Sequence, residues 1–173
     1  VPVLDYQEGM LSCNPMFTWP AGHLVKVERE DQIGDLYLDW GLHPARRVPF
    51  WEMVFHGCVV STWYWGDSVG YLEDVRPDLT DRKIAMTALY GSAPLIWATN
   101  LGIGFEGERK RRFLQVYNAI CPLHEVVGYE QMVSFEYLTA DRTVQRSRFS
   151  DGTEVTANLG GEPVTVTSAG EDW

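Results

Sequence analysis

The side chains best suited to chemistry gather between residues 56 and 67. His56 opens this segment, an apolar run follows it, and an aromatic string ends in Trp65, two residues before Asp67. An aromatic ring covers the apolar C–H face of a sugar, and a carboxylate accepts hydrogen bonds from sugar hydroxyl groups. The pattern predicts that Trp65 and Asp67 line one edge of a carbohydrate-binding site. We call this edge the sugar-binding rim. The alternative is that Trp63 and Trp65 only fill the core.

A second group of candidates lies near the start of the chain, where Asp5 and Glu8 are three residues apart. Glycosidases need two carboxyl groups, one as acid/base and the other as nucleophile or base. Sequence spacing does not show that Asp5 or Glu8 lies near Asp67. Acidic residues are abundant in this chain, so each of the two is also compatible with an ordinary surface position.

Signatures of other chemistries are missing from the sequence. It contains no HExxH, GxSxG or GxxxxGK motif, and its four histidines and three cysteines lack the spacing of zinc ligands. We therefore predict no metal and no cofactor, and we expect the cysteines to be packed thiols. Residues 102–107 match GxGxxG, but the chain then leads to antiparallel strands instead of a returning parallel strand. We interpret these glycines as a mobile loop.

The apolar run that carries the candidate rim predicts a strand at residues 58–65, because it is rich in β-branched and aromatic side chains and Gly66 stops it. A strand buried on both faces is typical of a parallel sheet or a barrel. Its end would deliver Trp65 and Asp67 to the rim where binding residues of α/β barrels lie. A short helix at residues 48–55 precedes it, with Pro49 in its first turn.

Two further helices are predicted. One runs to Tyr90 after a start that Asp78 or Thr80 can cap, and Gly91 ends it. The other runs from about residue 108 to 121, and Pro122 closes it. Its expected apolar face consists of Phe113, Leu114, Tyr117, Ile120 and Cys121.

The last third of the chain changes to an alternating pattern. Strand-like segments occur at residues 131–138, 143–149, 153–159 and 163–167, separated by turn signals such as the Asp-Gly pair at 151–152. This predicts an antiparallel meander of three to four strands. Alternate residues from 155 to 159 would face one side, and their neighbours the other.

Charge and hydropathy exclude several classes of function. The chain has 173 residues and a net charge of −10, which argues against nucleic acid or an anionic membrane as a partner. The basic run at residues 110–112 is interpreted as a solvated helix face, with Glu106 facing Lys110 and Glu108 facing Arg112. There is no apolar stretch of membrane-spanning length and no signal-peptide pattern, so this segment is expected to be soluble, with its location unknown.

Several strings of residues, taken together, resemble a known family. They are residues 5–12, 47–56 running into 59–67, and 136–145 with 149–153. In this order they resemble the bacterial glycoside hydrolases related to endo-α-N-acetylgalactosaminidases and the family 129 α-N-acetylgalactosaminidases. The site-lining candidates that match are Asp5, Glu8, His56, Trp65 and Asp67.

The resemblance implies a (β/α) TIM-type barrel followed by a β-rich domain, and a retaining hydrolase of α-linked N-acetylgalactosamine or related glycans. The expected fold is therefore α/β plus β, with residues 1–125 as the C-terminal part of the barrel. Residues 126–173 would form an antiparallel β meander or small sandwich. A complete barrel needs about 250 residues, so the main catalytic carboxylates are expected upstream and this segment alone is expected to be inactive. The alternative function is a non-catalytic carbohydrate-binding module.

Overall fold

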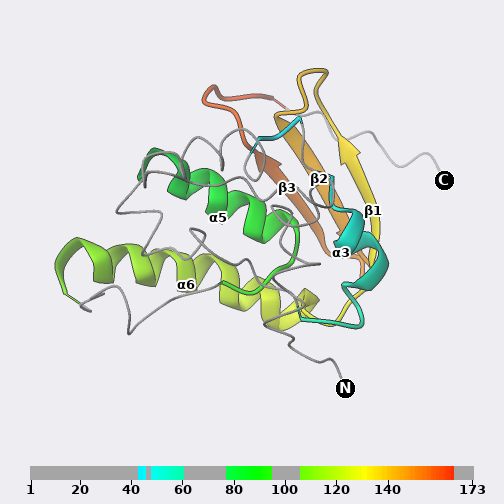
Figure 1. The fold of residues 1–173 in the computed structure, drawn as a ribbon, viewed down its shortest axis with the longest axis horizontal. Coiled ribbons are helices and arrows are strands. Elements are labelled where there is room, and N and C mark those ends of the chain that lie inside the picture. The colour runs from blue at the N-terminus through cyan, green and yellow to red at the C-terminus, as the bar shows by residue number, and fades with distance from the viewer. Residues whose placement is uncertain (1–42, 46–47, 61–76, 95–105, 166–173) are drawn as a thin grey trace, which may run out of the picture.

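The computed structural model describes residues 43–45, 48–60, 77–94 and 106–165. Helices α5 and α6 lie next to each other beside a three-stranded sheet, and the short helix α3 packs near strand β1 (Figure 1). The elements, in chain order, are α3 (Phe50–Phe55), the 3-10 turn η3 (Pro77–Leu79), α5 (Thr80–Leu89), α6 (Gly107–Val127), β1 (Met132–Tyr137), β2 (Val144–Phe149) and β3 (Glu154–Asn158).

The antiparallel meander is confirmed, in the order β1-β2-β3. Ala157 and Leu159 are buried, Val155 is half-buried, and the residues between them are exposed, as the alternation predicts. Gly152 has φ +90° in the turn between β2 and β3, a conformation that glycine adopts without steric cost. Residues 163–165 form no strand, so the described part of the predicted fourth segment is not part of the sheet.

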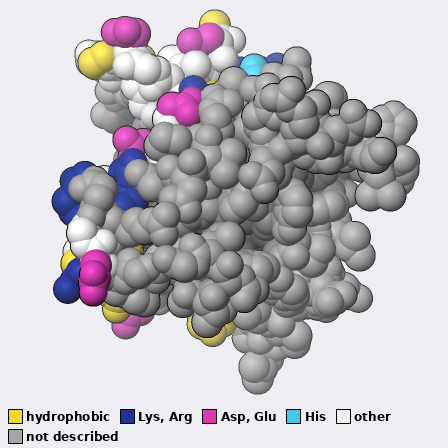
Figure 2. All heavy atoms as spheres, turned by 60° about the vertical axis from the view of Figure 1, so that its left-hand side comes forward, with side chains coloured by type: hydrophobic (Ala, Val, Ile, Leu, Met, Phe, Trp, Pro, Cys, Tyr) yellow, Lys and Arg dark blue, Asp and Glu magenta, His cyan; other side chains and the backbone are white. Residues whose placement is uncertain are grey.

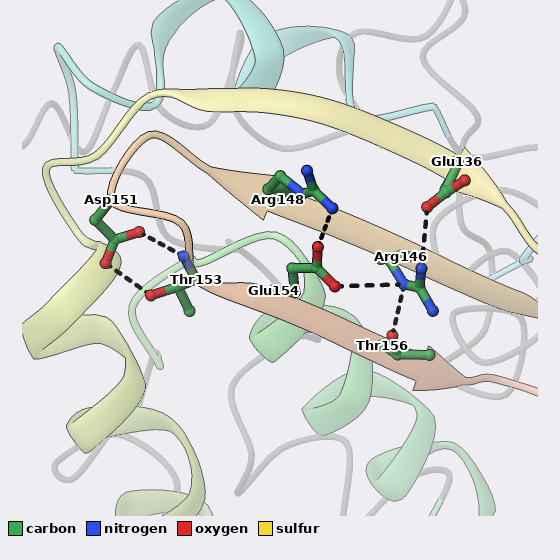
Figure 3. A network of polar contacts seen from close by, with 7 residues as sticks. All are labelled: Glu136, Arg146, Arg148, Asp151, Thr153, Glu154 and Thr156. Atoms are coloured by element: carbon green, nitrogen blue, oxygen red, sulfur yellow. Dashed lines mark hydrogen bonds and ion pairs between the residues drawn. The ribbon is translucent and has the colours of Figure 1, made fainter. Parts of the chain in front are cut away.

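The outer face of the sheet carries charged side chains from all three strands (Figure 3). Arg146 on β2 lies 3.5 Å from a carboxylate oxygen of Glu136 on β1 and 3.1 Å from Thr156 Oγ1 on β3. Arg148 forms an ion pair with Glu154, its direct partner in the β2–β3 register. Exposed ion pairs contribute little stability singly, so this network mainly keeps one face of the sheet polar.

The inner face of the sheet packs against helices and contributes to an apolar cluster of described residues. Phe149, Met132 and Val127 form one buried cluster, joined by half-buried Leu123, Phe135 and Val155 at its margin. A second cluster lies between the two long helices, where Val116 and Ile120 of α6 meet Ile84 and Ala88 of α5. The described helices therefore bury apolar side chains against each other and against the sheet.

Helix α6 differs from the prediction at its end and on its buried face. It continues through Pro122 to Val127, although proline removes the N–H that would bond to the carbonyl of Asn118. Asn118 and Pro122 are both exposed, so water can satisfy that carbonyl. The buried face consists of Val116, Ile120 and Val127, whereas Leu114 and Tyr117 of the predicted face are exposed.

Helix α5 ends as predicted but starts differently. Gly91 follows its last turn with φ +62°, which is typical of the residue after a helix. At the start neither Asp78 nor Thr80 caps the helix, because the N-cap is Leu79, which is already helical after the turn η3. The cap prediction was wrong since a 3-10 turn leads directly into the first α-helical turn.

Polar side chains are buried at helix α3, and several of its apolar side chains are exposed. Glu52 is buried at 4% exposure, and His56, which directly follows the helix, at 2%. The apolar side chains of Phe50 and Val54 point outward, with 71% and 44% of their surface exposed. A six-residue helix is too short to be stable by itself, so α3 depends on what its polar inner face contacts.

Replacing Phe149 with alanine is expected to destabilise the protein by about 3–5 kcal/mol, because this ring is fully buried in the sheet–helix core. Phe50→Ala is the matched control, since the same truncation at a 71% exposed ring removes little packing and should change stability by less than about 1 kcal/mol. Urea unfolding followed by circular dichroism measures both. Equal losses for the two variants would contradict this core.

Stability should fall in acid as the turn carboxylates of Asp141 and Asp151 become protonated. Hydrogen bonds lower the pKa of Asp141 below its usual 3.8, and the largest contribution comes from Thr139, followed by Thr143. Hydrogen bonds from Thr153 likewise lower the pKa of Asp151. Because the folded pKa is the lower one, the stabilisation is present above the unfolded pKa and is lost as pH falls through the folded value.

Urea unfolding between about pH 5 and pH 2 tests this titration. The double variant with Asp141→Asn and Asp151→Asn should lose less stability over that interval than the wild type, because it has two fewer carboxylates to protonate. An identical pH dependence in both proteins would show that the two turns do not contribute.

Candidate functional site

Of the five predicted site residues, the structure describes His56. Asp5, Glu8, Trp65 and Asp67 lie outside the described residues, as do residues 61–65 of the predicted strand and the glycines at 102 and 104. Residues 58–60, the described part of that strand, are not in a strand. The geometry available is therefore that of His56 and of the chain on either side of it.

His56 lies at the C-terminal end of α3 and is enclosed by three other parts of the chain. Its Nδ1 is 2.6 Å from the carbonyl oxygen of Glu130, between α6 and β1, and its Nε2 is 3.1 Å from the carbonyl oxygen of Gly91, after α5. The imidazole ring also lies 5.1 Å, centroid to centroid, from the ring of Phe149 on β2. Both ring nitrogens thus face main-chain acceptors.

A second histidine contacts the same acceptor. His124 of α6 has its Nδ1 2.9 Å from the carbonyl oxygen of Gly91, and Ser147 of β2 donates its hydroxyl to the carbonyl of Leu89 at 2.5 Å. The last carbonyls of a helix have no partner within it and carry partial negative charge. At the end of α5 the Ser147 hydroxyl supplies such a partner to Leu89, and ring nitrogens of His56 and His124 lie against the carbonyl of Gly91, two residues further on.

The end of α3 is held at a further point. Gln131 donates its side-chain amide to the carbonyl of Met53 at 2.5 Å, and the main-chain amides of Cys58 and Val59 both bond to the carbonyl of Phe55, at 2.8 and 3.0 Å. From Met53 to Val59 the backbone is therefore fixed by hydrogen bonds to the core and to itself. This fixed stretch leads directly into the segment that contains Trp65 and Asp67.

The sequence did not indicate His124 or Gln131 as partners of this region. They follow His56 by 68 and 75 positions, and no motif spacing connects residues so far apart. Local clues existed, because a helix that ends at a glycine leaves carbonyls in need of donors. The identity of those donors follows only from how α3, α5 and α6 pack.

Other candidate groups offer less chemistry. The described residues include no set of three His, Cys, Asp or Glu side chains placed to hold a metal ion. Burial raises the pKa of the half-buried Cys121 thiol, whereas Cys58 is exposed, so the prediction of a packed thiol was wrong for Cys58. The sequence places Cys58 at the start of an apolar run, but the chain there leaves α3 on the surface.

The basic run at the start of α6 is a mixed-charge surface. Arg112 forms an ion pair with Asp81 of α5 at 2.7 Å and also donates to Gln115. Figure 2 shows basic side chains gathered at one edge of the molecule with acidic ones beside them. Lys110 and Arg111 are exposed as predicted, but Arg112 is only 15% exposed and pairs with Asp81 of the neighbouring helix, which was not anticipated.

None of the described helices combines the length and apolar character that a membrane crossing requires.

Comparison with known proteins identifies relatives. A family model described as glycosyl hydrolases related to GH101 family, GH129, matches residues 19–148. No curated protein gives a match. Two solved structures of the α-N-acetylgalactosaminidase NagBb from Bifidobacterium bifidum, a quadruple mutant and a GalNAc complex, are similar at 25% identity, with TM-scores of 0.45 and 0.44. Each comparison covers 70% of this chain and 18% of NagBb, so the chain spans less than a fifth of that enzyme's length.

Gly91→Ala is expected to destabilise the protein by about 2 kcal/mol or more. A Cβ at this position would lie 2.5 Å from His56 Nε2 and 2.9 Å from Phe149 Cζ, and φ is +62°. Gly152→Ala is the matched control, because its φ is +90° but no atom lies within 4 Å of the added carbon. Thermal unfolding compares them, and a loss at Gly91 no larger than at Gly152 would show that the His56 contact is not tight.

Proposed function

This chain belongs to the GH129 glycosyl hydrolases, which are related to the GH101 family, and we propose that it is part of a retaining hydrolase of α-linked N-acetylgalactosamine or related glycans. The observation that carries the proposal is the family match, which includes the aromatic and acidic segment before Asp67. Within that enzyme the chain contributes part of the sugar-binding rim. The site-lining candidates are Asp5, Glu8, His56, Trp65 and Asp67.

The roles follow from the chemistry of the side chains. The ring of Trp65 offers an apolar surface to the C–H face of a pyranose, and Asp67 accepts hydrogen bonds from its hydroxyl groups. A carboxylate after an apolar run must reach solvent, a partner or a ligand, because burying it unpaired is costly. Asp5 and Glu8 would add acceptors to the same rim.

A retaining mechanism needs two carboxyl groups about 5–5.5 Å apart. One carboxylate attacks the anomeric carbon while the other, as an acid, protonates the departing glycosidic oxygen. Water then attacks the covalent glycosyl-enzyme, and the second group takes the proton from that water, so both carboxyl groups are regenerated. We place this pair upstream of the chain, in the main body of the catalytic domain.

The proposed architecture assigns residues 1–125 to the end of a (β/α) barrel and residues 126–173 to an appended antiparallel domain. The described helices α5 and α6 pack on each other, and α5 also contacts β2 and β3 of the meander that follows, so the assignment of the helices to a barrel rests on the family relationship. A barrel needs about 250 residues, so strands from outside this chain would complete it.

Asp67→Asn, made in the full-length protein that contains this chain, should lower kcat/KM on an aryl α-N-acetylgalactosaminide by about 10- to 100-fold. That range corresponds to losing a charge-assisted hydrogen bond to the substrate. Asp81→Asn is the matched control, because this carboxylate is exposed and pairs with Arg112, and it should leave kcat/KM unchanged.

The outcomes separate the alternatives. If the full-length protein hydrolyses no α-linked glycoside, the hydrolase proposal is wrong. Sugar binding without hydrolysis would then favour a carbohydrate-binding module. If wild type is active and a folded Asp67→Asn variant has unchanged kinetics, Asp67 does not belong to the rim. Activity of the isolated chain would contradict the upstream location of the catalytic pair.

A further inference from the structure

We propose that His56 is a positioning residue, which fixes the point where the chain leaves α3 on its way to Trp65 and Asp67. The inference rests on the proposed function, because it assumes that those two residues bind sugar. It changes the role of His56 from lining the rim to holding the backbone from which part of the rim extends.

The first argument is that His56 has no polar group left to offer a substrate. Its side chain is 2% exposed, and its two nitrogens lie 2.6 Å from the carbonyl of Glu130 and 3.1 Å from that of Gly91. A neutral imidazole carries one N–H and donates from one nitrogen at a time. A sugar hydroxyl would therefore have to displace a main-chain contact inside the core.

The second argument is that the contacts of His56 come from parts of the chain that are far apart. Gly91 follows α5, Glu130 precedes β1, and Phe149 ends β2. The side chain of His56 thus links the end of α3 to a helix and two strands, in addition to the bond from Gln131 to Met53. The outward-facing apolar residues of α3 cannot do this, since Phe50 and Val54 are exposed.

The third argument is continuity along the backbone. The amides of Cys58 and Val59 bond to the carbonyl of Phe55, so a displacement of His56 moves the chain up to residue 59 with it. Trp65 and Asp67 follow within eight residues of that point. Misplacing a binding group by about 1 Å can reduce catalysis by about 100-fold, so a small shift at the anchor has a measurable effect.

His56→Ala and His124→Ala in the full-length protein form the central comparison. Both variants remove a ring nitrogen from the Gly91 carbonyl, but only His56 adjoins the segment that leads to the rim. We expect KM for an aryl α-N-acetylgalactosaminide to rise about 10-fold in His56→Ala and to stay within about twofold of wild type in His124→Ala. A loss of folded protein alone would lower the apparent kcat and leave KM unchanged.

His56→Asn provides the rescue, because its amide can replace Nδ1 as the donor to Glu130. Its KM should return to within about threefold of wild type. If His56→Ala does not fold, His56→Gln replaces it in the comparison. The Gln amide reaches toward the carbonyl of Gly91 but not toward that of Glu130, so the contact with Glu130 is still lost. Amide hydrogen exchange at Cys58 and Val59 gives a second readout, which should accelerate about 10-fold in His56→Ala and not in His124→Ala.

Unchanged KM in a folded His56 variant, or an equal rise in the His124 variant, would overturn the inference. So would unchanged exchange at Cys58 and Val59. These results are distinct from failure of the proposed function. If Asp67→Asn impairs the enzyme while His56→Ala does not, only the positioning role fails. If the full-length protein has no glycosidase activity, the proposed function fails, and the exchange data decide whether His56 fixes the end of α3.

Discussion

The carbonyl oxygen of Gly91 is the acceptor on which the arrangement of the described helices depends. It ends α5, and it receives ring nitrogens from His56 after α3 and from His124 in α6. Gly91 has a left-handed conformation with φ +62°, and His56 and Phe149 occupy the space that a Cβ would take there. One main-chain atom thus brings three helices to the edge of the sheet.

Polar contacts of this kind complement the two apolar clusters that the described residues form. Ser147 donates to Leu89, and Gln145 donates its amide to the carbonyls of Pro44 and Arg142, all within buried or half-buried surroundings. Apolar burial supplies most of the driving force but permits many arrangements of short elements. Directional hydrogen bonds in a low-dielectric interior select one of them. This explains how α3 keeps its place while Phe50 and Val54 face outward.

The elements that the sequence predicted best are those whose pattern is set by neighbouring residues. Alternation from 154 to 159 predicted the faces of β3, and Gly91 marked the end of α5. Prediction failed where packing overrode a local rule. Proline usually closes a helix, but the exposed position of Pro122 and the burial of Val127 allow α6 to continue. The buried face of α6 was predicted correctly at Ile120 but not at Leu114 and Tyr117, which are exposed, since an apolar residue does not reveal which side meets α5.

The sequence by itself determined the antiparallel meander, the main helices and the family of the chain, because each is encoded in residue order or in local periodicity. It also identified His56 as a residue of interest, through its place in a resembling string. Only the tertiary structure decided what His56 contacts. Its partners lie 35 and 74 positions away, and burial against two carbonyls depends on how α3, α5 and the start of β1 pack together.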